Sequence, residues 1–277
     1  MSNLAGRSPL FEAQHALRYE RQQIIRDYQS AHDCRLVVMS DVIFPRSISL
    51  LEEALFDASP EEDLHILLYT LGGDGETALR LIRQAQSRCK ELTVVVPDQA
   101  KSAGTLFALG ADRIYMGPTS DLGPVDPQFM LSGSLAAAKA IIAAVEEAER
   151  RVQENPQTYP LHASLLGDIT GLMVQQARDA LERADAQLRE ALACVESRSS
   201  AIVDQMVATL RGPLLDDSPS HGVVISSKAA KSLGLPVDEA DPSDPRWQAV
   251  WRLWTKYVAL GAEFVYEGQT ASHIRVP

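Results

Sequence analysis

One serine stands where a strand pattern gives way to a helix pattern. The stretch VVVPDQAKSAGTLFALGADRIYMGP (94–118) begins as an apolar run typical of a buried strand, passes through a polar turn, and places Ser102 directly before an apolar helical segment. A serine hydroxyl at such a corner can act as a nucleophile when a neighbouring base removes its proton. It can also act only as a helix cap, by accepting hydrogen bonds from the first N–H groups of the helix. Taken alone, the position favours the cap.

A pair of glycines stands at the end of the preceding strand pattern. In LLYTLGGDGETALRLI (67–82), Gly72 and Gly73 follow an apolar run, and a helix pattern begins behind Asp74. Glycines let backbone N–H groups point into open space at the start of a helix, where these groups can stabilise a developing negative charge. A single Gly-Gly pair is more often only a tight turn. The segment GGDGETA also lacks the G-x-G-x-x-G spacing of a dinucleotide-binding loop.

The serine and the glycine pair lie about thirty residues apart, which is the length of one βαβ unit. In a parallel sheet, successive units place their turns on neighbouring strands at the same carboxyl edge. Ser102 would then face the N–H groups of the Gly72-Gly73 turn. The sequence therefore predicts a nucleophile opposite an oxyanion hole.

The segments around these two turns alternate between short apolar runs and helical patterns. Alternation of this kind predicts an α/β fold with a parallel sheet that is buried on both faces. The expected strands cover 34–43, 65–73, 92–98 and 113–118, and the expected helices between them cover 47–58, 74–90 and 102–111.

The rest of the chain is expected to add helices to this core. The predicted regions are an N-terminal amphipathic helix (1–30), the α/β core with the candidate nucleophile (31–131), a helical region that completes the core (132–240), and a Trp-rich C-terminal helical extension (241–277). One helical face of the extension carries Trp247, Trp251, Trp254 and Val258. Such a face usually packs on the core or on another subunit.

The bulk composition narrows the classes of function. The chain has 277 residues, a formal net charge of −11 and 45% hydrophobic residues, which is enough for a substantial core. The negative charge and the lack of a basic run argue against nucleic acid and anionic membranes as partners. Cys34, Cys89 and Cys194 are far apart and predict reduced thiols, with no disulfide or metal site. Without an uncharged apolar run of about 18 residues, we expect a cytoplasmic protein with no stable membrane insertion and no cofactor.

Three stretches carry a resemblance to a known family. They are LYTLGGDGETALRLI (68–82), AKSAGTLFALGADRIYMGPTSDLGPVDPQ (100–128) and, with less similarity, SHGVVISSKAAKSLGLPV (220–237). They resemble the serine dehydrogenase proteinase family, which is related to signal peptide peptidase A and, more distantly, to the Clp protease proteolytic subunit. The resemblance implies a ClpP/crotonase-like fold, in which a parallel sheet is flanked by helices, with a long helical insertion and a C-terminal helical extension.

The resemblance also implies roles for single residues. Ser102 in KSAGT takes the place of the family's nucleophile, and the N–H groups of Gly73 and Ala103 take the place of its oxyanion donors. The stretch LGPVDPQ (122–128) takes the place of the loop that borders the peptide groove. The groove residues expected from this correspondence are Gly72, Leu122, Gly123 and Pro124.

The general base is the least defined part of the pattern. The Clp protease subunit has a histidine shortly beyond its serine, whereas this chain has no histidine between Ser102 and His162. Relatives of signal peptide peptidase use a lysine, and an amine can serve as a base when burial lowers its pKa toward neutrality. Lys139 lies 37 residues beyond Ser102 among small apolar residues, a spacing similar to that in relatives with a Ser-Lys dyad. Lys139 is therefore the expected base, and the alternatives are Lys101, His162 and His221.

Three classes of function remain from the sequence. The first is a serine peptidase with a Ser-Lys dyad, which acts on peptides or unfolded proteins and assembles as a homo-oligomer. The second is a catalytically inactive relative that binds peptides. The third is a crotonase-type acyl-CoA enzyme, which the sequence disfavours because it offers no catalytic carboxylate pair and leaves Ser102 without a role.

Overall fold

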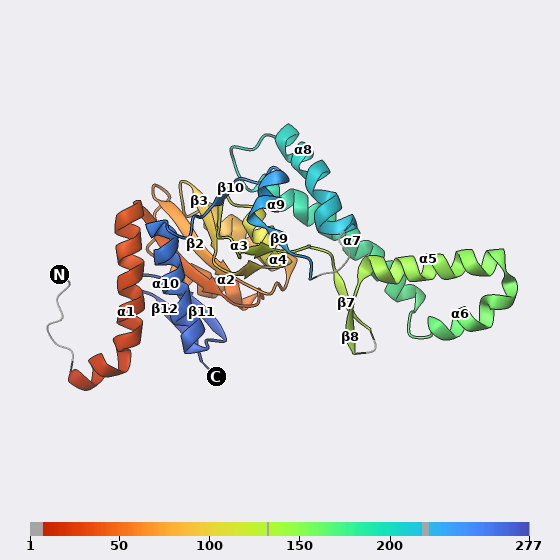
Figure 1. Cartoon of the computed structure of the whole chain (residues 1–277), viewed down its shortest axis with the longest axis horizontal. Helices are drawn as coiled ribbons and strands as arrows, with labels where there is room; N and C mark the ends of the chain where they lie inside the picture. The colour runs from red at the N-terminus through yellow and green to blue at the C-terminus, as the bar shows by residue number, and fades with distance from the viewer. Residues whose placement is uncertain (1–7, 132, 218–221, 277) are drawn as a thin grey trace.

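A mostly parallel sheet forms the centre of the molecule (Figure 1). The computed structural model describes residues 8–131, 133–217 and 222–276. Within these residues, a seven-stranded sheet has the order β10-β5-β3-β2-β1-β11-β12. Its parallel strands are β1 (Cys34–Ser40), β2 (Asp63–Tyr69), β3 (Leu92–Val96), β5 (Arg113–Met116) and β10 (Val237–Glu239). The predicted α/β fold class is confirmed, since the first four of these strands lie within or overlap the predicted ranges.

The sheet is buried on both faces because its strands send alternate side chains into two separate cores. In β1, Val37 and Met39 join the core that contains residues of α2 (Arg46–Ala54), α3 (Gly75–Gln86) and α4 (Ala103–Leu109). Leu36 and Val38 join the opposite core, which contains residues of α1 (Pro9–His32) and α10 (Pro245–Leu260). Successive side chains of a strand face opposite sides of a sheet, so both helical layers are needed to exclude water.

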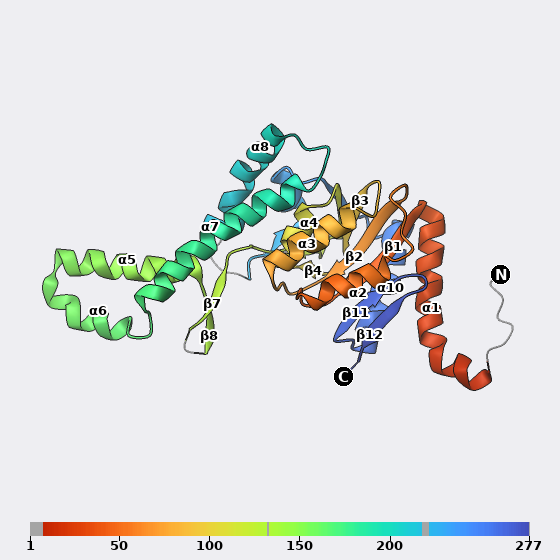
Figure 2. The ribbon, with the colours of Figure 1, turned by 180° about the vertical axis from the view of Figure 1, so that it is seen from behind.

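A helical arm projects from one end of the body (Figures 1 and 2). At its base lies the hairpin of β7 (Gln128–Leu131) and β8 (Ser134–Ala137). The arm itself consists of α5 (Ala138–Glu154), a 3₁₀ turn (Pro156–Thr158), α6 (Tyr159–Leu165) and the first part of α7 (Gly171–Ala193). The second part of α7 returns to the body, where Ala184, Leu188 and Leu192 join the core. One continuous helix therefore connects the arm to the body.

The remaining elements complete the body. They are α8 (Ser200–Arg211), a π-helical turn (Gly212–Asp216), α9 (Ser227–Ser232), and a small sheet with the order β4-β6-β9, formed by β4 (Gln99–Ala100), β6 (Asp121–Leu122) and β9 (Ile225–Ser226). The predicted helical region 132–240 is thus mainly helical, although it also supplies β8, β9 and β10. None of the helices in the described parts of the chain is long and apolar enough to cross a membrane.

The C-terminal extension differs from the prediction, because it is only partly helical. After α10, the chain forms a hairpin of β11 (Phe264–Glu267) and β12 (Ser272–Arg275), and β11 pairs antiparallel with β1. The buried face of α10 also differs from the predicted face, which carries Trp247, Trp251, Trp254 and Val258. Trp247 and Trp254 are buried together with Val250, Leu253 and Tyr257, whereas Trp251 is 45% exposed and Val258 is 59% exposed. The helix is rotated in this way because it packs against α1 as well as the sheet.

A buried ion pair holds the ends of the chain together. The Glu267 carboxylate, which is fully buried, accepts from Arg21 Nε at 2.7 Å, from the Tyr257 hydroxyl at 2.7 Å and from the Ser272 hydroxyl at 2.8 Å. These partners come from α1, α10 and β12. The carboxylate thus links three elements through charge-assisted hydrogen bonds, which are stronger than neutral ones.

Candidate active site

The Gly-Gly turn and the serine turn lie side by side because the backbone segments before them are paired. Beyond the ends of β2 and β3, pairing resumes as a parallel bridge between Thr70 and Ala100. The N–H and the C=O of Thr70 each form a 3.0 Å hydrogen bond to the backbone on either side of Ala100. Gly72 and Ser102 each stand two residues further along these segments. The adjacency that the sequence predicts is therefore confirmed.

The backbone of Ser102 is strained. Its φ of 49° and ψ of −111° are those of the first central residue of a type II′ turn, a position that glycine normally occupies. The Gly104 N–H closes this turn by donating to the Lys101 carbonyl at 2.7 Å. The Ser102 hydroxyl makes no capping hydrogen bond to α4. The structure therefore contradicts the interpretation of Ser102 as a helix cap, and it places the residue in a conformation of the kind that concentrates at functional sites.

The two glycines leave space for two neighbouring segments, the serine turn and the backbone at Ile43. Gly72 has a φ of 116° and Gly73 a φ of 137°, which side chains other than glycine rarely adopt. A Cβ atom on Gly72 would lie 2.9 Å from the Cβ atom of Ser102, and a Cβ atom on Gly73 would collide with the backbone of Ile43. Glycine is therefore required at position 72 for the serine turn to approach, and at position 73 for the backbone of Ile43 to approach.

The N–H groups of Gly73 and Ala103 belong to peptide units whose carbonyl groups accept backbone hydrogen bonds on the opposite side. The Gly72 carbonyl accepts from the Ile43 N–H at 2.8 Å, and the Ser102 carbonyl accepts from the Leu106 N–H at 3.1 Å. In a trans peptide the C=O and the following N–H point in opposite directions. The Gly73 N–H thus points away from Ile43, and the Ala103 N–H points away from α4. Across the described residues, neither group has a hydrogen-bond partner.

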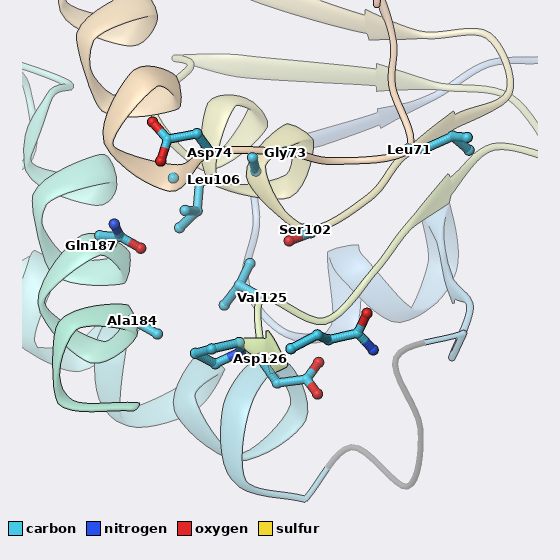
Figure 3. A pocket seen from close by; sticks show the side chains of 13 residues that line it. Leu71, Gly73, Asp74, Ser102, Leu106, Val125, Asp126, Ala184 and Gln187 are labelled. Carbon is cyan, nitrogen blue, oxygen red and sulfur yellow. The ribbon is translucent and has the colours of Figure 1, made fainter. Parts of the chain in front are cut away.

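These groups open into one cavity of about 380 Å³. Figure 3 shows the Ser102 hydroxyl directed into this cavity, with Leu106 and Val125 beside it and Gln187 on the opposite wall. The cavity is lined by Leu71, Gly73, Asp74, Gly75, Ser102, Ala103, Leu106, Val125, Asp126, Pro127, Gln128, Ala184 and Gln187. Four segments therefore build it: the Gly-Gly turn, the start of α4, residues 125–128 and α7.

The predicted groove residues lie elsewhere. Leu122, Gly123 and Pro124 are buried and do not line the cavity, whereas residues 125–128 do. These residues are buried because β6 is the middle strand of the small sheet and pairs with a strand on each side. Leu122 pairs with β4 and β9, and the Gly123 backbone both accepts from and donates to the Thr105 hydroxyl, at 2.8 Å and 3.0 Å. Gly72 likewise lies behind Ser102 and not in the cavity wall.

Lys101, an alternative for the base, is engaged with the small sheet. Its amine forms an ion pair with Asp121 and donates to the Leu122 carbonyl at 3.4 Å and the Val223 carbonyl at 3.3 Å. Both charged side chains are nearly buried, at 13% and 15% exposed. Lys101 therefore holds the segments of β6 and β9 against the serine turn, and its amine does not contact Ser102.

Lys139 lies behind the cavity wall. It is the second residue of α5, and its amine donates to the Leu215 carbonyl at 3.2 Å. The start of α5 is tied to the wall, because the Ala138 N–H donates to the Pro127 carbonyl at 2.9 Å. The neighbouring Leu214 carbonyl accepts from the Val125 N–H at 2.9 Å. Lys139 thus stands next to residues 125–127 without itself lining the cavity.

The two histidine alternatives are not part of the described site. His162 belongs to α6, which lies in the outer part of the arm, far from α4 in both views (Figures 1 and 2). His162 therefore does not reach Ser102 of the same chain. His221 lies outside the described residues.

Comparison with known families places this site in context. Residues 52–246 match the model of a family described as ClpP-like SDH-type serine proteinases, which covers more than half of the chain. The chain belongs to this family. The resemblance inferred from the two turns is thus confirmed.

Curated relatives of this chain include two uncharacterized proteins of Methanocaldococcus jannaschii. One is 27% identical over 191 residues, which cover 69% of this chain and 59% of the relative. The other is 23% identical over 185 residues, which cover 66% of this chain and 55% of the relative. The match thus spans less than two thirds of the length of both relatives.

Solved structures that resemble the chain include a ClpP protein and a stomatin-specific protease. ClpP1 from Listeria monocytogenes is 16% identical, with coverage of 77% of this chain and 96% of that chain and a TM-score of 0.41. A mutant of the 1510-N membrane-bound stomatin-specific protease, in complex with a substrate peptide, is 16% identical, with coverage of 78% and 95% and a TM-score of 0.38.

Several residues that line this cavity are not predicted by the sequence. Ala184 and Gln187 come from α7, in a segment whose helical pattern carries no local sign of a site. Asp126, which is only 1% exposed, belongs to the predicted loop, but the sequence pattern assigns it no role. Of these three residues, only Asp126 has a feature in the sequence that could have indicated a functional role. It is an acidic residue between an apolar residue and Pro127, which is unusual in a buried segment. Across the described ranges, no group of His, Cys, Asp and Glu residues is arranged to hold a metal ion.

Proposed function

We propose that this chain is a serine peptidase with Ser102 as its nucleophile and the N–H groups of Gly73 and Ala103 as its oxyanion hole. The Ser102 Oγ attacks the carbonyl carbon of the scissile peptide bond and passes its proton to a general base. The two N–H groups donate to the oxygen that becomes negatively charged. The tetrahedral intermediate then expels the amine, which takes the proton from the base, and water hydrolyses the remaining ester by the same route in reverse.

One observation carries this proposal. Ser102 holds a conformation that costs about 1–3 kcal/mol in other proteins, and its hydroxyl does not use that position to cap α4. The strained turn instead directs the hydroxyl into a cavity shared with Gly73 and Ala103, whose N–H groups have no partner among the described residues. A purely structural serine has no need of this arrangement.

Lys139 is the proposed general base. It stands beside residues 125–127, and a lysine carries its amine on a flexible four-carbon stem. The amine must leave the Leu215 carbonyl, which it binds at 3.2 Å, to reach Ser102. Catalytic hydrogen bonds often form only when substrate is bound. Lys101 is a poorer choice because its amine is held by Asp121.

The proposal is tested by labelling and by hydrolysis. A fluorophosphonate probe is expected to modify the wild-type chain and not Ser102→Ala. In a peptide hydrolysis assay, Lys139→Met should lower the rate by about 10²–10⁴-fold, the usual contribution of general acid–base catalysis. Its effect should approach that of Ser102→Ala, because a nucleophile and its base act as one unit. The control variants are Lys228→Met, which removes an exposed lysine, and His162→Gln, and both should keep most of the activity.

Two results would contradict parts of the proposal. Wild-type hydrolysis by Lys139→Met would remove Lys139 as the base while leaving Ser102 in place. Failure of the probe to label wild-type protein that is folded would remove the peptidase function itself.

A peptide-binding protein without hydrolysis is the second candidate. It is favoured by one observation: among the described residues, the Ser102 hydroxyl has no hydrogen-bond partner that could serve as a base. In that case wild type and Ser102→Ala would bind peptides equally and neither would cleave them. The predicted homo-oligomer stays a prediction, and exposed apolar side chains of the arm, such as Tyr159, Leu161 and Leu165, offer a surface for it.

A further inference from the structure

The cavity beside Ser102 ends at α7, a helix that belongs partly to the arm. Ala184 and Gln187 line the cavity from this helix, and Figure 3 places the Gln187 amide across the cavity from the Ser102 hydroxyl. The amide packs closely on the start of α3, since a Cβ atom on Gly75 would lie 2.6 Å from Gln187 Oε1. Glycine at position 75 therefore lets the amide lie at this end of the cavity.

The orientation of the Gln187 amide is set by its neighbour Glu76. Gln187 Nε2 donates to Glu76 Oε1 at 2.8 Å. Arg183 donates to both oxygens of the same carboxylate and, through these hydrogen bonds, lowers the pKa of Glu76. An ionised carboxylate only accepts hydrogen bonds, so the NH₂ group of the amide must face Glu76. The amide oxygen is left for the cavity, and Figure 3 shows it on the cavity side.

The other walls of the cavity combine apolar side chains with carboxyl groups. Leu106, Val125 and Ala184 form apolar wall between Ser102 and Gln187. Two carboxylic residues, Asp74 and Asp126, also line the cavity, and the described lining residues include no lysine, arginine or histidine. A side chain that fits this cavity needs an apolar stem and hydrogen-bond donors at its end.

We propose that Gln187 selects substrates whose residue before the scissile bond is lysine or arginine. This inference rests on the proposed peptidase function, in which the cavity receives that side chain. The methylene stem packs on Leu106, Val125 and Ala184, and the terminal N–H groups donate to Gln187 Oε1. The long stems of these two residues prefer apolar contacts while their charged ends seek acceptors. A site built to accept a hydrogen bond rejects analogues that lack the donor, because its own acceptor is then left unpaired.

The test compares peptides of one sequence that differ only at this residue, which is lysine, arginine, methionine, leucine or glutamate. Their binding to the full-length Ser102→Ala chain is measured by fluorescence anisotropy, and their hydrolysis is measured with wild type. Lysine and arginine peptides should bind about 10- to 100-fold more tightly than the methionine peptide, the usual effect of one hydrogen bond to a charged group. The kcat/KM values for wild type should follow the same order.

A matched pair of variants assigns the preference to Gln187. Gln187→Met, made in the Ser102→Ala chain, keeps the length of the side chain and removes the amide, so the preference for lysine over methionine should fall to within about threefold, below the effect of one such hydrogen bond. Gln175→Met changes the same residue type on the exposed arm part of α7 and should leave the preference unchanged. Equal thermal unfolding of the two variants shows that Gln187→Met is folded.

The outcomes separate this inference from the proposed function. Tighter binding of leucine or methionine peptides, or an unchanged lysine preference in Gln187→Met, would overturn the inference while hydrolysis by wild type still supports the peptidase. A lysine preference in binding without any hydrolysis would support the role of Gln187 and contradict the peptidase function. No binding of any of the peptides would overturn the inference.

Discussion

The strain at Ser102 leads to a prediction about stability that can be measured without a substrate. Glycine adopts the observed φ of 49° and ψ of −111° without a steric penalty, whereas any residue with a Cβ atom is strained there. Ser102→Gly should therefore relieve about 1–3 kcal/mol of strain in the folded chain. Ser102→Ala removes the hydroxyl and keeps the strain, so it isolates the contribution of the backbone.

The expected gain is smaller than the strain itself. Glycine also makes the unfolded chain more flexible than alanine does, which lowers the free energy of unfolding by roughly 0.5–1 kcal/mol. The free energy of unfolding of Ser102→Gly should thus exceed that of Ser102→Ala by up to about 2.5 kcal/mol, the difference between the two effects. Both variants should lose labelling by the fluorophosphonate probe, because neither has a nucleophile.

Urea denaturation at one protein concentration measures this difference. Equal slopes of the unfolding transitions would show that the two variants unfold from comparable states. If Ser102→Gly is less stable than Ser102→Ala by about 0.5–1 kcal/mol, only the unfolded-state effect remains and the serine turn is not strained. That result would remove the observation on which the assignment of Ser102 depends.

Two further predictions concern the packing of the ends of the chain on the sheet. Glu267→Gln should lower the free energy of unfolding by about 3–5 kcal/mol, measured by urea denaturation, because it leaves the buried Arg21 guanidinium without its charge partner; a change below about 1 kcal/mol, the size of an exposed pair, would contradict this. Burial, assisted by repulsion from Arg246 and His32, lowers the pKa of His65 from 6.5 to about 3. Between these pH values His65 binds a proton in the unfolded chain but not in the folded chain. The free energy of unfolding should therefore fall as the pH decreases from about 6.5 toward 3. His65→Gln should show a shallower loss over this range, and an unchanged slope of stability against pH would contradict the assignment.

The local elements and the two turns can be predicted from the sequence. The strand and helix patterns between residues 34 and 118 are carried by near neighbours in the chain, and all observed elements there except the two-residue strand β4 lie within or overlap the predicted ranges. The approach of Gly72 and Ser102 is also predictable, because consecutive parallel strands place their turns at the same edge of the sheet. The order of the residues along the chain is therefore enough to group Ser102 with Gly73 and Ala103.

The walls of the cavity depend on contacts between distant parts of the chain. Position 122 is expected in the groove, yet its side chain is buried because β6 pairs with β9, more than 100 residues further along. Gln187 reaches the site only because α7 returns from the arm and packs on α3 and α4. The helical periodicity of α7 does not distinguish Gln187, which lines the cavity, from the residues of the helix that pack in the core.

The alternating α/β core, the serine turn and the family can all be predicted from the sequence, because the patterns that indicate them are short runs of neighbouring residues. Contacts between distant segments set three other features: which face of α10 is buried, the addition of Phe264–Glu267 as a strand at the free edge of β1, and the ion pair of Lys101 with Asp121. The physical reason is that the burial of a side chain and the pairing of a strand edge are set by which segment covers them. Such a partner can lie anywhere in the chain, so the pattern of neighbouring residues does not specify it.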